Sequence, residues 1–169
     1  MEFLKKNKIK ISKEEEERIE IVDHGLGYNQ PIMVNILVYA NTDKYCVKEL
    51  VLFPGQICPQ HRHPPLGDYP GKQEAFRCRF GEIYLYVPAG KPVKKPRAKV
   101  PANKKNCFTI WNEIVLKPGD QYTLPPNTWH WFQAGPQGAI VSEFSSKSVD
   151  EADVFADPDI KRITEISKK

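Results

Sequence analysis

The feature that most constrains the fold of this chain is a succession of short β-strand candidates separated by turn residues. Each candidate is rich in Val, Ile, Leu, Phe and Tyr, and turn sequences such as Asn41-Thr42-Asp43 and Pro54-Gly55 follow the first two. The 15 prolines favour short elements over long helices. Many short strands at this spacing indicate an all-β sandwich or barrel. The predicted strands are 33–39, 45–53, 74–80, 82–87, 108–116, 121–124, 129–133 and 139–144.

One short helix is predicted before the strands. Ser12 and Glu15 form a capping-box pattern, and the helix is expected to run to about Val22, before Gly25-Leu26-Gly27 ends it. A chain of 169 residues usually forms one domain with a sizeable core. We expect a single domain over residues 1–169. Its parts are a helical extension over about 1–25, a barrel over about 30–145 and a C-terminal tail over 146–169.

The charge of the chain is concentrated in one segment. The net charge is only +4, and much of the excess lies between Lys91 and Lys105. The fold as a whole is therefore not strongly basic, and we expect no nucleic-acid partner. Residues 88–106 are also rich in proline, so we interpret them as a solvated, extended loop. A phosphate- or partner-binding patch is the alternative for this segment.

The cysteines and the apolar segments indicate where in the cell the protein is expected. Cys46, Cys58, Cys78 and Cys107 form no C-x-x-C pair, so neither a zinc ribbon nor a redox motif is indicated. We expect them to be half-buried strand residues in a reducing compartment. No stretch approaches the roughly 20 apolar residues of a membrane span, and the first residues do not form a signal peptide. We therefore expect a cytoplasmic protein with no membrane partner.

Three histidines and a glutamate form a candidate metal site. His61 and His63 are two residues apart, so on a strand both side chains point to the same face. Glu74 opens the next strand and His130 lies on a late one. Three neutral imidazoles and one carboxylate suit a divalent first-row metal with open positions for a substrate. Three unrelated histidines remain the alternative if the spacing is considered alone.

The residues around these side chains carry a family resemblance. They are Gly55, Gly81, Gly119 and Pro125. Their order, Gly, His-x-His, Glu, Gly and then Gly, Pro, His, resembles the two motifs of the cupin family. The resemblance implies a double-stranded β-helix, or jelly-roll barrel, that holds one divalent metal ion with His61, His63, Glu74 and His130.

The chain departs from the cupin pattern in three places. The gap between His63 and Glu74 is longer than the family's usual one, and its turn-rich residues are expected to bulge outward without moving Glu74. Asn127 stands where the second motif normally has Gly, and Asn tolerates the left-handed turn that Gly would supply. Ala134 stands where the motif normally has Asn.

Glu143 and Lys72 are the candidate catalytic residues. We interpret residues 135–138 as a hairpin loop, which would place Glu143 opposite His130 and inside the same cavity. A carboxylate in an apolar barrel near a metal is a candidate general base. A register slip of one residue would instead turn Glu143 to water. Lys72 is either a surface lysine or a cation that polarises or protonates a substrate oxygen, and position alone does not separate the two.

A closer resemblance covers about residues 39–162. The sequences at 61–65, 71–74, 130–135 and 143–145 resemble the D-lyxose ketol-isomerases, which are cupin sugar isomerases. The resemblance implies that Lys72 and Glu143 act in proton transfer. It implies a divalent metal, Mn²⁺ first, with Zn²⁺, Co²⁺ or Fe²⁺ as alternatives, and a homodimer. It also implies interconversion of D-lyxose with D-xylulose, and of D-mannose with D-fructose.

Such an isomerisation moves the C2 proton of an aldose to C1 through an enediol. Glu143 is suited to carry that proton and Lys72 to stabilise charge on oxygen. Three aromatic residues are candidates for walling the site, or for plain core packing: Trp129, Trp131 and Phe132. Two other functions remain open, a metal-dependent cupin oxygenase and a non-enzymatic sugar-binding or regulatory cupin. An isomerase of phosphorylated sugars would need Arg77 or Arg79 to point inward.

Overall fold

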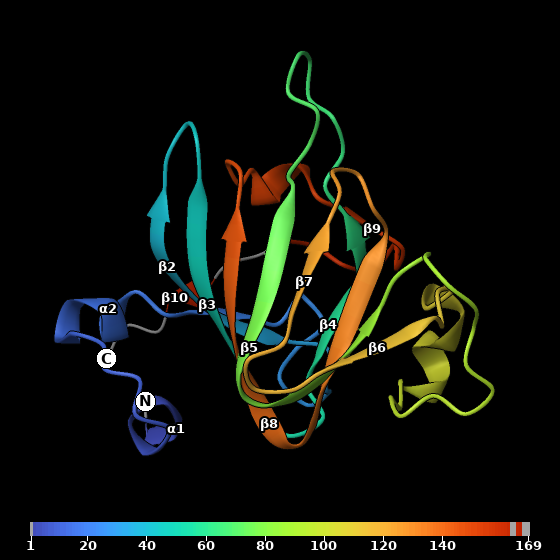
Figure 1. Ribbon diagram of the computed structural model, residues 1–169, viewed down its shortest axis with the longest axis horizontal. Coiled ribbons are helices and arrows are strands. Elements are labelled where there is room, and N and C mark those ends of the chain that lie inside the picture. The colour runs from blue at the N-terminus through green and yellow to red at the C-terminus, as the bar shows by residue number, and fades with distance from the viewer. Residues whose placement is uncertain (1, 163–164, 167–169) are drawn as a thin grey trace.

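The computed structural model describes residues 2–162 and the backbone of residues 165–166, and most of its elements are strands (Figure 1). The strands are β1 (Glu20–Val22), β2 (Val34–Asn41), β3 (Cys46–Leu52), β4 (Ile57–Arg62), β5 (Glu74–Tyr86), β6 (Glu113–Leu116), β7 (Gln121–Leu124), β8 (His130–Ser145), β9 (Val154–Phe155) and β10 (Glu165–Ile166). The helices are α1 (Glu2–Lys6) and α2 (Lys13–Glu17), with 3₁₀ turns η1 (Ala102–Cys107) and η2 (Asp150–Ala152). The predicted all-β fold class is confirmed.

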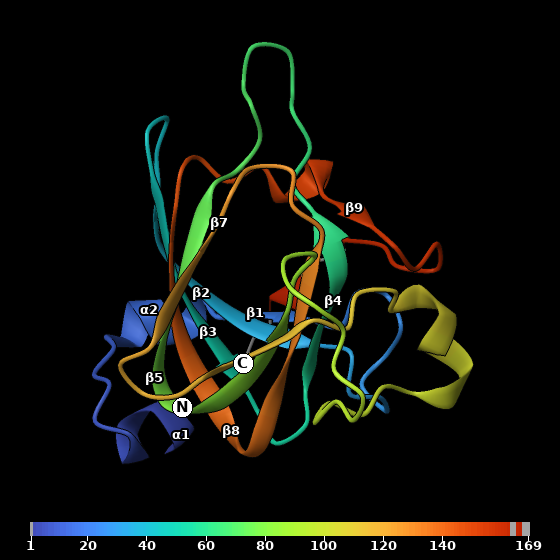
Figure 2. The same ribbon diagram turned by 45° about the vertical axis from the view of Figure 1, so that its right-hand side comes forward.

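The strands form one curled antiparallel sheet that closes on itself as a barrel (Figures 1 and 2). Along its main path the order is β10-β1-β2-β3-β8-β4-β9, while β5 pairs with β6, β7 and β8. The two long strands β5 and β8 run side by side, from Glu74 opposite Ser145 to Tyr86 opposite Trp131. The barrel has two faces, and both contain part of β5 and β8. The core lies between these two faces.

The predicted hairpin at residues 135–138 is wrong. In the described sheet, the two segments of β8 that flank these residues pair with β5 and not with each other. One segment also pairs with β4 and the other with β3, so β8 bends from one face of the barrel into the other. At the bend, a Cβ on Gly81 of β5 would lie 2.0 Å from the carbonyl oxygen of Gly138. Glycine is needed here because two backbones approach closely, and the predicted turn is a barrel corner.

The N-terminal helix begins as predicted but ends earlier. The Ser12 hydroxyl accepts a hydrogen bond from the Glu15 amide at 3.2 Å, and the Glu15 carboxylate accepts one from the Ser12 amide at 2.7 Å. The predicted end near Val22 is wrong, because α2 stops at Glu17 and β1 follows, paired with β2. Ile21 and Val22 are β-branched, and Val22 is fully buried, so pairing and burial favour a strand there.

A separate apolar cluster lies on the outside of the barrel, where the basic segment 88–106 packs against it. The Tyr86 and Trp131 rings stack with centroids 4.0 Å apart, and Phe108 and Ala98 pack beside them. Residues 88–106 are therefore anchored at Ala98 and partly 3₁₀-helical, rather than wholly extended. The strand predicted at 108–116 begins only at Glu113, because the preceding residues pack on this cluster.

The four cysteines are free thiols that only partly follow the expectation of half-buried strand residues. Cys58 is a half-buried strand residue, but Cys46 and Cys78 are fully buried on their strands, and Cys107 ends η1. Within the described residues, no helix has the length and apolar character needed to cross a membrane.

Candidate active site

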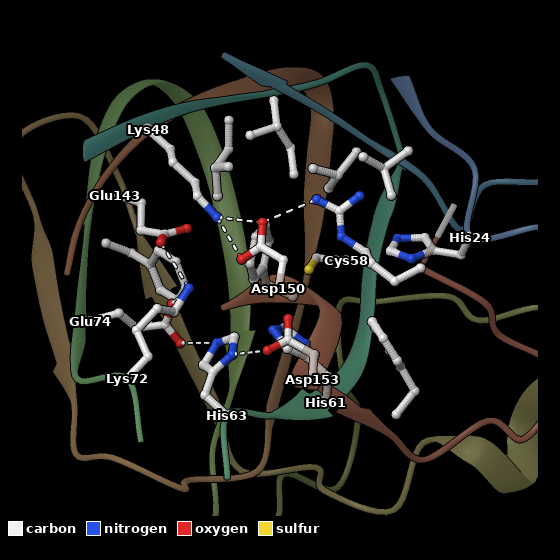
Figure 3. A pocket seen from close by; sticks show the side chains of 18 residues that line it. His24, Lys48, Cys58, His61, His63, Lys72, Glu74, Glu143, Asp150 and Asp153 are labelled. Atoms are coloured by element: carbon white, nitrogen blue, oxygen red, sulfur yellow. Dashed lines mark hydrogen bonds and ion pairs between the residues drawn. The ribbon is translucent and has the colours of Figure 1, made fainter. Parts of the chain in front are cut away.

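A cavity inside the barrel brings the predicted site residues together (Figure 3). It lies at the end of the barrel where β5 begins and β8 ends. Five of the six predicted residues line it: His61, His63, Lys72, Glu74 and Glu143. The sixth, His130, is fully buried directly beside His61. Apolar side chains such as Ile36 and Phe132 line the rest of the wall.

The pairing of β4 with β8 positions the three imidazoles. His61 and His130 are Cα partners in this pair, and His63 follows two residues after His61, just beyond β4. The ring centroid of His61 lies 4.3 Å from that of His130 and 4.9 Å from that of His63. One ring nitrogen from each histidine lies within 4.8 Å of the other two. Three nitrogens this close can share one ion at bond lengths of about 2.1 Å after small side-chain adjustments.

Glu74 supplies a carboxylate at the same point. Its Oε1 lies 3.1 Å from His63 Nε2 and 3.0 Å from His130 Nε2. The long gap before Glu74 projects beyond the barrel as a loop between β4 and β5 (Figure 1). The two ends of the loop meet where a Cβ on Gly71 would lie 2.4 Å from the His63 carbonyl oxygen. As expected, the insertion bulges outward while Glu74 stays next to the histidines.

The Nδ1 atom of each of the three histidines already has a hydrogen-bond partner. The Nδ1 of His61 lies 2.8 Å from the Pro59 carbonyl oxygen, and that of His130 lies 2.9 Å from the Thr128 carbonyl oxygen. The Nδ1 of His63 lies 2.5 Å from Asp153 Oδ1. Because carbonyl and carboxylate oxygens only accept hydrogen bonds, each Nδ1 carries the proton, which leaves the Nε2 lone pairs of His61 and His130 available.

This arrangement fits a bound cation. His130 Nε2 is buried without a hydrogen-bond partner among the described residues, although a Glu74 oxygen lies only 3.0 Å away. A lone pair facing a carboxylate is unfavourable unless a positive charge lies between them. Burial disfavours a charge on His63, but Glu74 and the hydrogen bond to Asp153 raise its pKa to about 9. The donor set therefore favours a positive charge at this point, which a divalent metal ion would supply.

Lys72 joins the two carboxylates of the cavity. Its Nζ lies 2.8 Å from Glu143 Oε1 and 2.8 Å from Glu74 Oε2, and all three side chains are buried. Burial disfavours the ammonium, but Glu143 and Glu74 raise the pKa of Lys72 well above its ordinary value. Burial likewise opposes ionisation of Glu74, but Lys72 and His63 hold its pKa well below its usual range. Lys72 is thus a buried cation, and the surface-lysine alternative is wrong.

Glu143 reaches the cavity by a different register from the predicted one. It is the Cα partner of Lys48 on β3 and of Phe76 on β5, and the prediction that it lies opposite His130 is wrong. Glu143 and His130 lie on different segments of β8, and the curvature of the barrel turns both inward. Only 4% of Glu143 is exposed, so the water-facing alternative is also wrong.

Comparison with known proteins identifies the family. Residues 35–169 match the D-lyxose isomerase family. The chain belongs to the D-lyxose isomerase family. A D-lyxose ketol-isomerase from Thermofilum sp. is 63% identical over 164 residues, which cover 97% of this chain and 91% of the relative. A D-lyxose/D-mannose isomerase from Thermosediminibacter oceani is 59% identical, with 98% of this chain and 91% of the relative covered. Membership makes the protein a sugar aldose–ketose isomerase and confirms the predicted resemblance.

Solved structures confirm the fold. An L-ribose isomerase from Cellulomonas parahominis superposes with a TM-score of 0.75 at 17% identity, covering 94% of this chain and 88% of the other. A Klebsiella pneumoniae protein with a double-stranded β-helix domain superposes with a TM-score of 0.51 at 19% identity, covering 78% of this chain and 88% of the other. The predicted cupin barrel is therefore the fold of this family member.

Several residues of the cavity were not predicted from the sequence. The segment after β8 crosses the end of the barrel and contributes Asp150 and Asp153 (Figure 3). Lys48 Nζ lies 2.8 Å from both Asp150 oxygens. The tail residues carry no periodic signal that would place them in the site. For Lys48 one signal existed, because it alternates with the apolar Cys46 and Leu50 on the inward face of β3.

The three aromatic candidates for the cavity wall do not all point into the cavity. Phe132 lines the cavity, as expected for a residue two positions after His130. Trp131 packs in the outer cluster, and Trp129 lies under the Arg62 guanidinium, whose central carbon is 5.3 Å from the ring centroid. Arg77 and Arg79 are exposed on the outer face of β5, so neither provides a cation inside the barrel.

Proposed function

We propose that the protein is a metal-dependent isomerase that interconverts D-lyxose with D-xylulose, and D-mannose with D-fructose, through an enediol intermediate. One observation carries this proposal. Lys72 holds the Glu143 carboxylate and the Glu74 carboxylate at 2.8 Å each, beside three histidines whose nitrogens converge. A proton carrier, a fixed cation and a metal-binding set therefore meet in one buried cavity.

The residues divide the chemistry between them. A divalent ion held by His61, His63, Glu74 and His130 would polarise the substrate carbonyl and stabilise negative charge on its oxygens. Glu143 takes the proton from C2 of the aldose and returns it to C1, while the hydroxyl proton on O2 is transferred to O1, so that a ketose results. Lys72 orients the Glu143 carboxylate, and its ammonium stabilises charge that develops on a substrate oxygen.

Unphosphorylated sugars suit this cavity better than sugar phosphates. The inward cations Lys48, Lys72 and Arg162 already form ion pairs, with Asp150, with the two glutamates of the cavity and, for Arg162, also with Glu20. A phosphate group would have to compete with these carboxylates and would bring further negative charge close to them. Arg77 and Arg79 lie on the outer face and do not reach the cavity.

A sugar panel in deuterated water tests the proposal. Metal-loaded protein is incubated with unphosphorylated pentoses and hexoses, and aldose–ketose conversion is measured. We expect D-lyxose and D-mannose to be converted, with deuterium at C1 of the ketose, because a protonated carboxylate exchanges with solvent. Failure to convert either sugar would refute the proposed substrates. Conversion without deuterium would indicate a hydride shift and refute the proton-transfer role of Glu143.

Three finer properties are proposed together with this function. We propose Mn²⁺ as the ion, with Zn²⁺, Co²⁺ and Fe²⁺ as alternatives, because the mixed imidazole–carboxylate set accommodates each of them. We propose a homodimer, a state supported by the exposed aromatic residues Tyr45 and Phe144, which lie where β3 begins and β8 ends. A cytoplasmic location completes the proposal. Elemental analysis, sedimentation and cell fractionation test these three properties separately.

A further inference from the structure

His24 is a buried side chain at the edge of the cavity for which the proposed chemistry has no role. It follows β1, lines the cavity and is only 4% exposed. Among the described residues, neither of its ring nitrogens has a hydrogen-bond partner. A buried polar group without a partner destabilises a fold, and an imidazole that lacks both partners is unusual. The position therefore indicates a ligand that completes these hydrogen bonds.

The backbone holds His24 in an uncommon conformation. Its φ of 56° lies in the left-handed region, which only a few per cent of non-glycine residues adopt, although His does so more often than most. The Asp23 carboxylate accepts a hydrogen bond from the Gly25 amide at 2.9 Å, and the His24 carbonyl accepts one from the Lys161 amide at 3.0 Å. Such strain persists only where the surrounding structure enforces it, and it concentrates at functional sites.

Phe155 connects His24 to the candidate metal site. The Phe155 ring meets the His24 ring edge-on at 5.6 Å and stacks against the His61 ring at 5.7 Å. Figure 3 shows His24 on the opposite side of the cavity from Glu143 and Lys72, with Asp150 between them and with His61 and His63 lower in the view. A linear ligand that reacts beside Glu143 would therefore extend toward His24.

The chemistry of the ring matches a sugar hydroxyl. Burial and the nearby Arg162 lower the pKa of His24 to about 4, although Asp23 opposes this shift. The imidazole is therefore neutral at physiological pH, with one nitrogen that donates a hydrogen bond and one that accepts. A hydroxyl group also donates and accepts, so a polyhydroxylated chain can satisfy both nitrogens.

We propose that His24 binds a hydroxyl at the end of the open-chain sugar farthest from the reacting carbons, and so determines specificity for that end. This inference depends on the proposed isomerase function, because the reaction places C1 and C2 beside Glu143 and Lys72. His24 would act by binding and positioning, not by moving the proton.

Binding of unreactive polyols tests His24 without requiring turnover. The probes are D-lyxitol and 5-deoxy-D-lyxitol, which differ by the terminal hydroxyl, and their affinities for the metal-loaded protein are measured by calorimetry. We expect the wild type to bind D-lyxitol roughly tenfold more tightly, the usual range for one hydrogen bond in a buried site. His24→Asn should lose this preference. Asn tolerates the left-handed backbone, so the turn should be kept.

A matched control separates hydrogen bonding from cavity shape. Ile36→Val changes an apolar lining residue and should retain the preference for D-lyxitol. Ring nitrogen chemical shifts of His24 in the wild type give a second measurement that needs no variant, and D-lyxitol should move them more than the deoxy compound.

The outcomes distinguish this inference from the proposed function. A wild type that binds the two polyols equally, or binds neither, overturns the role of His24. So does an unchanged preference in His24→Asn, or a His24 ring that does not respond to D-lyxitol. Lack of conversion in the sugar panel, with the polyol preference intact, would instead refute the isomerase proposal alone.

Discussion

Replacing Asp153 with Asn tests whether the C-terminal segment builds the metal site. Asp153 Oδ1 lies 2.5 Å from His63 Nδ1, and the Asp153 side chain is 10% exposed. The substitution preserves the size of the side chain but removes the charge that holds the His63 ring. The other two histidines are held by backbone carbonyls of Pro59 and Thr128, which no side-chain change removes. Asp153 is therefore the one orienting contact of the three that a substitution can weaken by itself.

The expected loss is moderate because all four proposed ligands remain. Removing a group that orients a metal-bound histidine typically costs roughly 10- to 100-fold in metal affinity. This range corresponds to about 1.4–2.7 kcal/mol of binding free energy. Competition with a chelator of known affinity measures the dissociation constant for Mn²⁺ in wild type and variant.

A matched substitution provides the control. Asp157 is also buried, but it pairs with Lys104, at 2.8 Å, and does not line the cavity. Asp157→Asn should therefore leave Mn²⁺ affinity unchanged, although it removes the same charge from the same segment. Wild-type affinity in Asp153→Asn, or an equal loss in the two variants, would refute the orienting role of Asp153.

The remaining predictions concern the proton carrier, the basic segment and the core. Glu143→Gln should lower turnover by roughly 10² or more, because a general base is lost, while metal content stays the same; full turnover would exclude Glu143 as the base. The basic segment 88–106 contains Lys94, Lys95, Arg97 and Lys99. Replacing these four residues with Ser should change turnover of a neutral sugar only a few-fold, and loss of turnover in a folded variant would make the segment part of the site. Phe76→Ala, at a position 1% exposed, should lower the free energy of unfolding by about 3–5 kcal/mol in denaturant titrations. Phe144→Ala, at a position 44% exposed, should cost far less, and equal losses would contradict this account of the core.

The insertion after His63 and the turn at Asn127 show where local reasoning succeeded. Asn127 adopts the left-handed conformation expected of it, with φ of 58°. The insertion projects outward, and Gly71 returns the chain to the His63 backbone. Both outcomes depend on residues adjacent in sequence, whose backbone preferences are readable without knowledge of the rest of the fold.

The segment 135–138 shows where local reasoning failed. A glycine-rich sequence suits a hairpin turn and a barrel corner equally well, because both need small residues and a sharp bend. The choice between them is made by β5, which pairs with both segments of β8. The same limit applies to Val22, where pairing with β2 favours a strand over the predicted helix.

Local spacing was enough to predict the barrel and to propose His61, His63 and Glu74 as ligands. Strand periodicity and a family motif can both be recognised from residues that are close together in sequence. Glu143 was assigned to the correct cavity through an incorrect register. His24, Lys48 and Asp153 enter the cavity only through the tertiary structure. They come from three segments distant in sequence, and no periodic pattern in one segment records which side chains of another will face it once the barrel has closed.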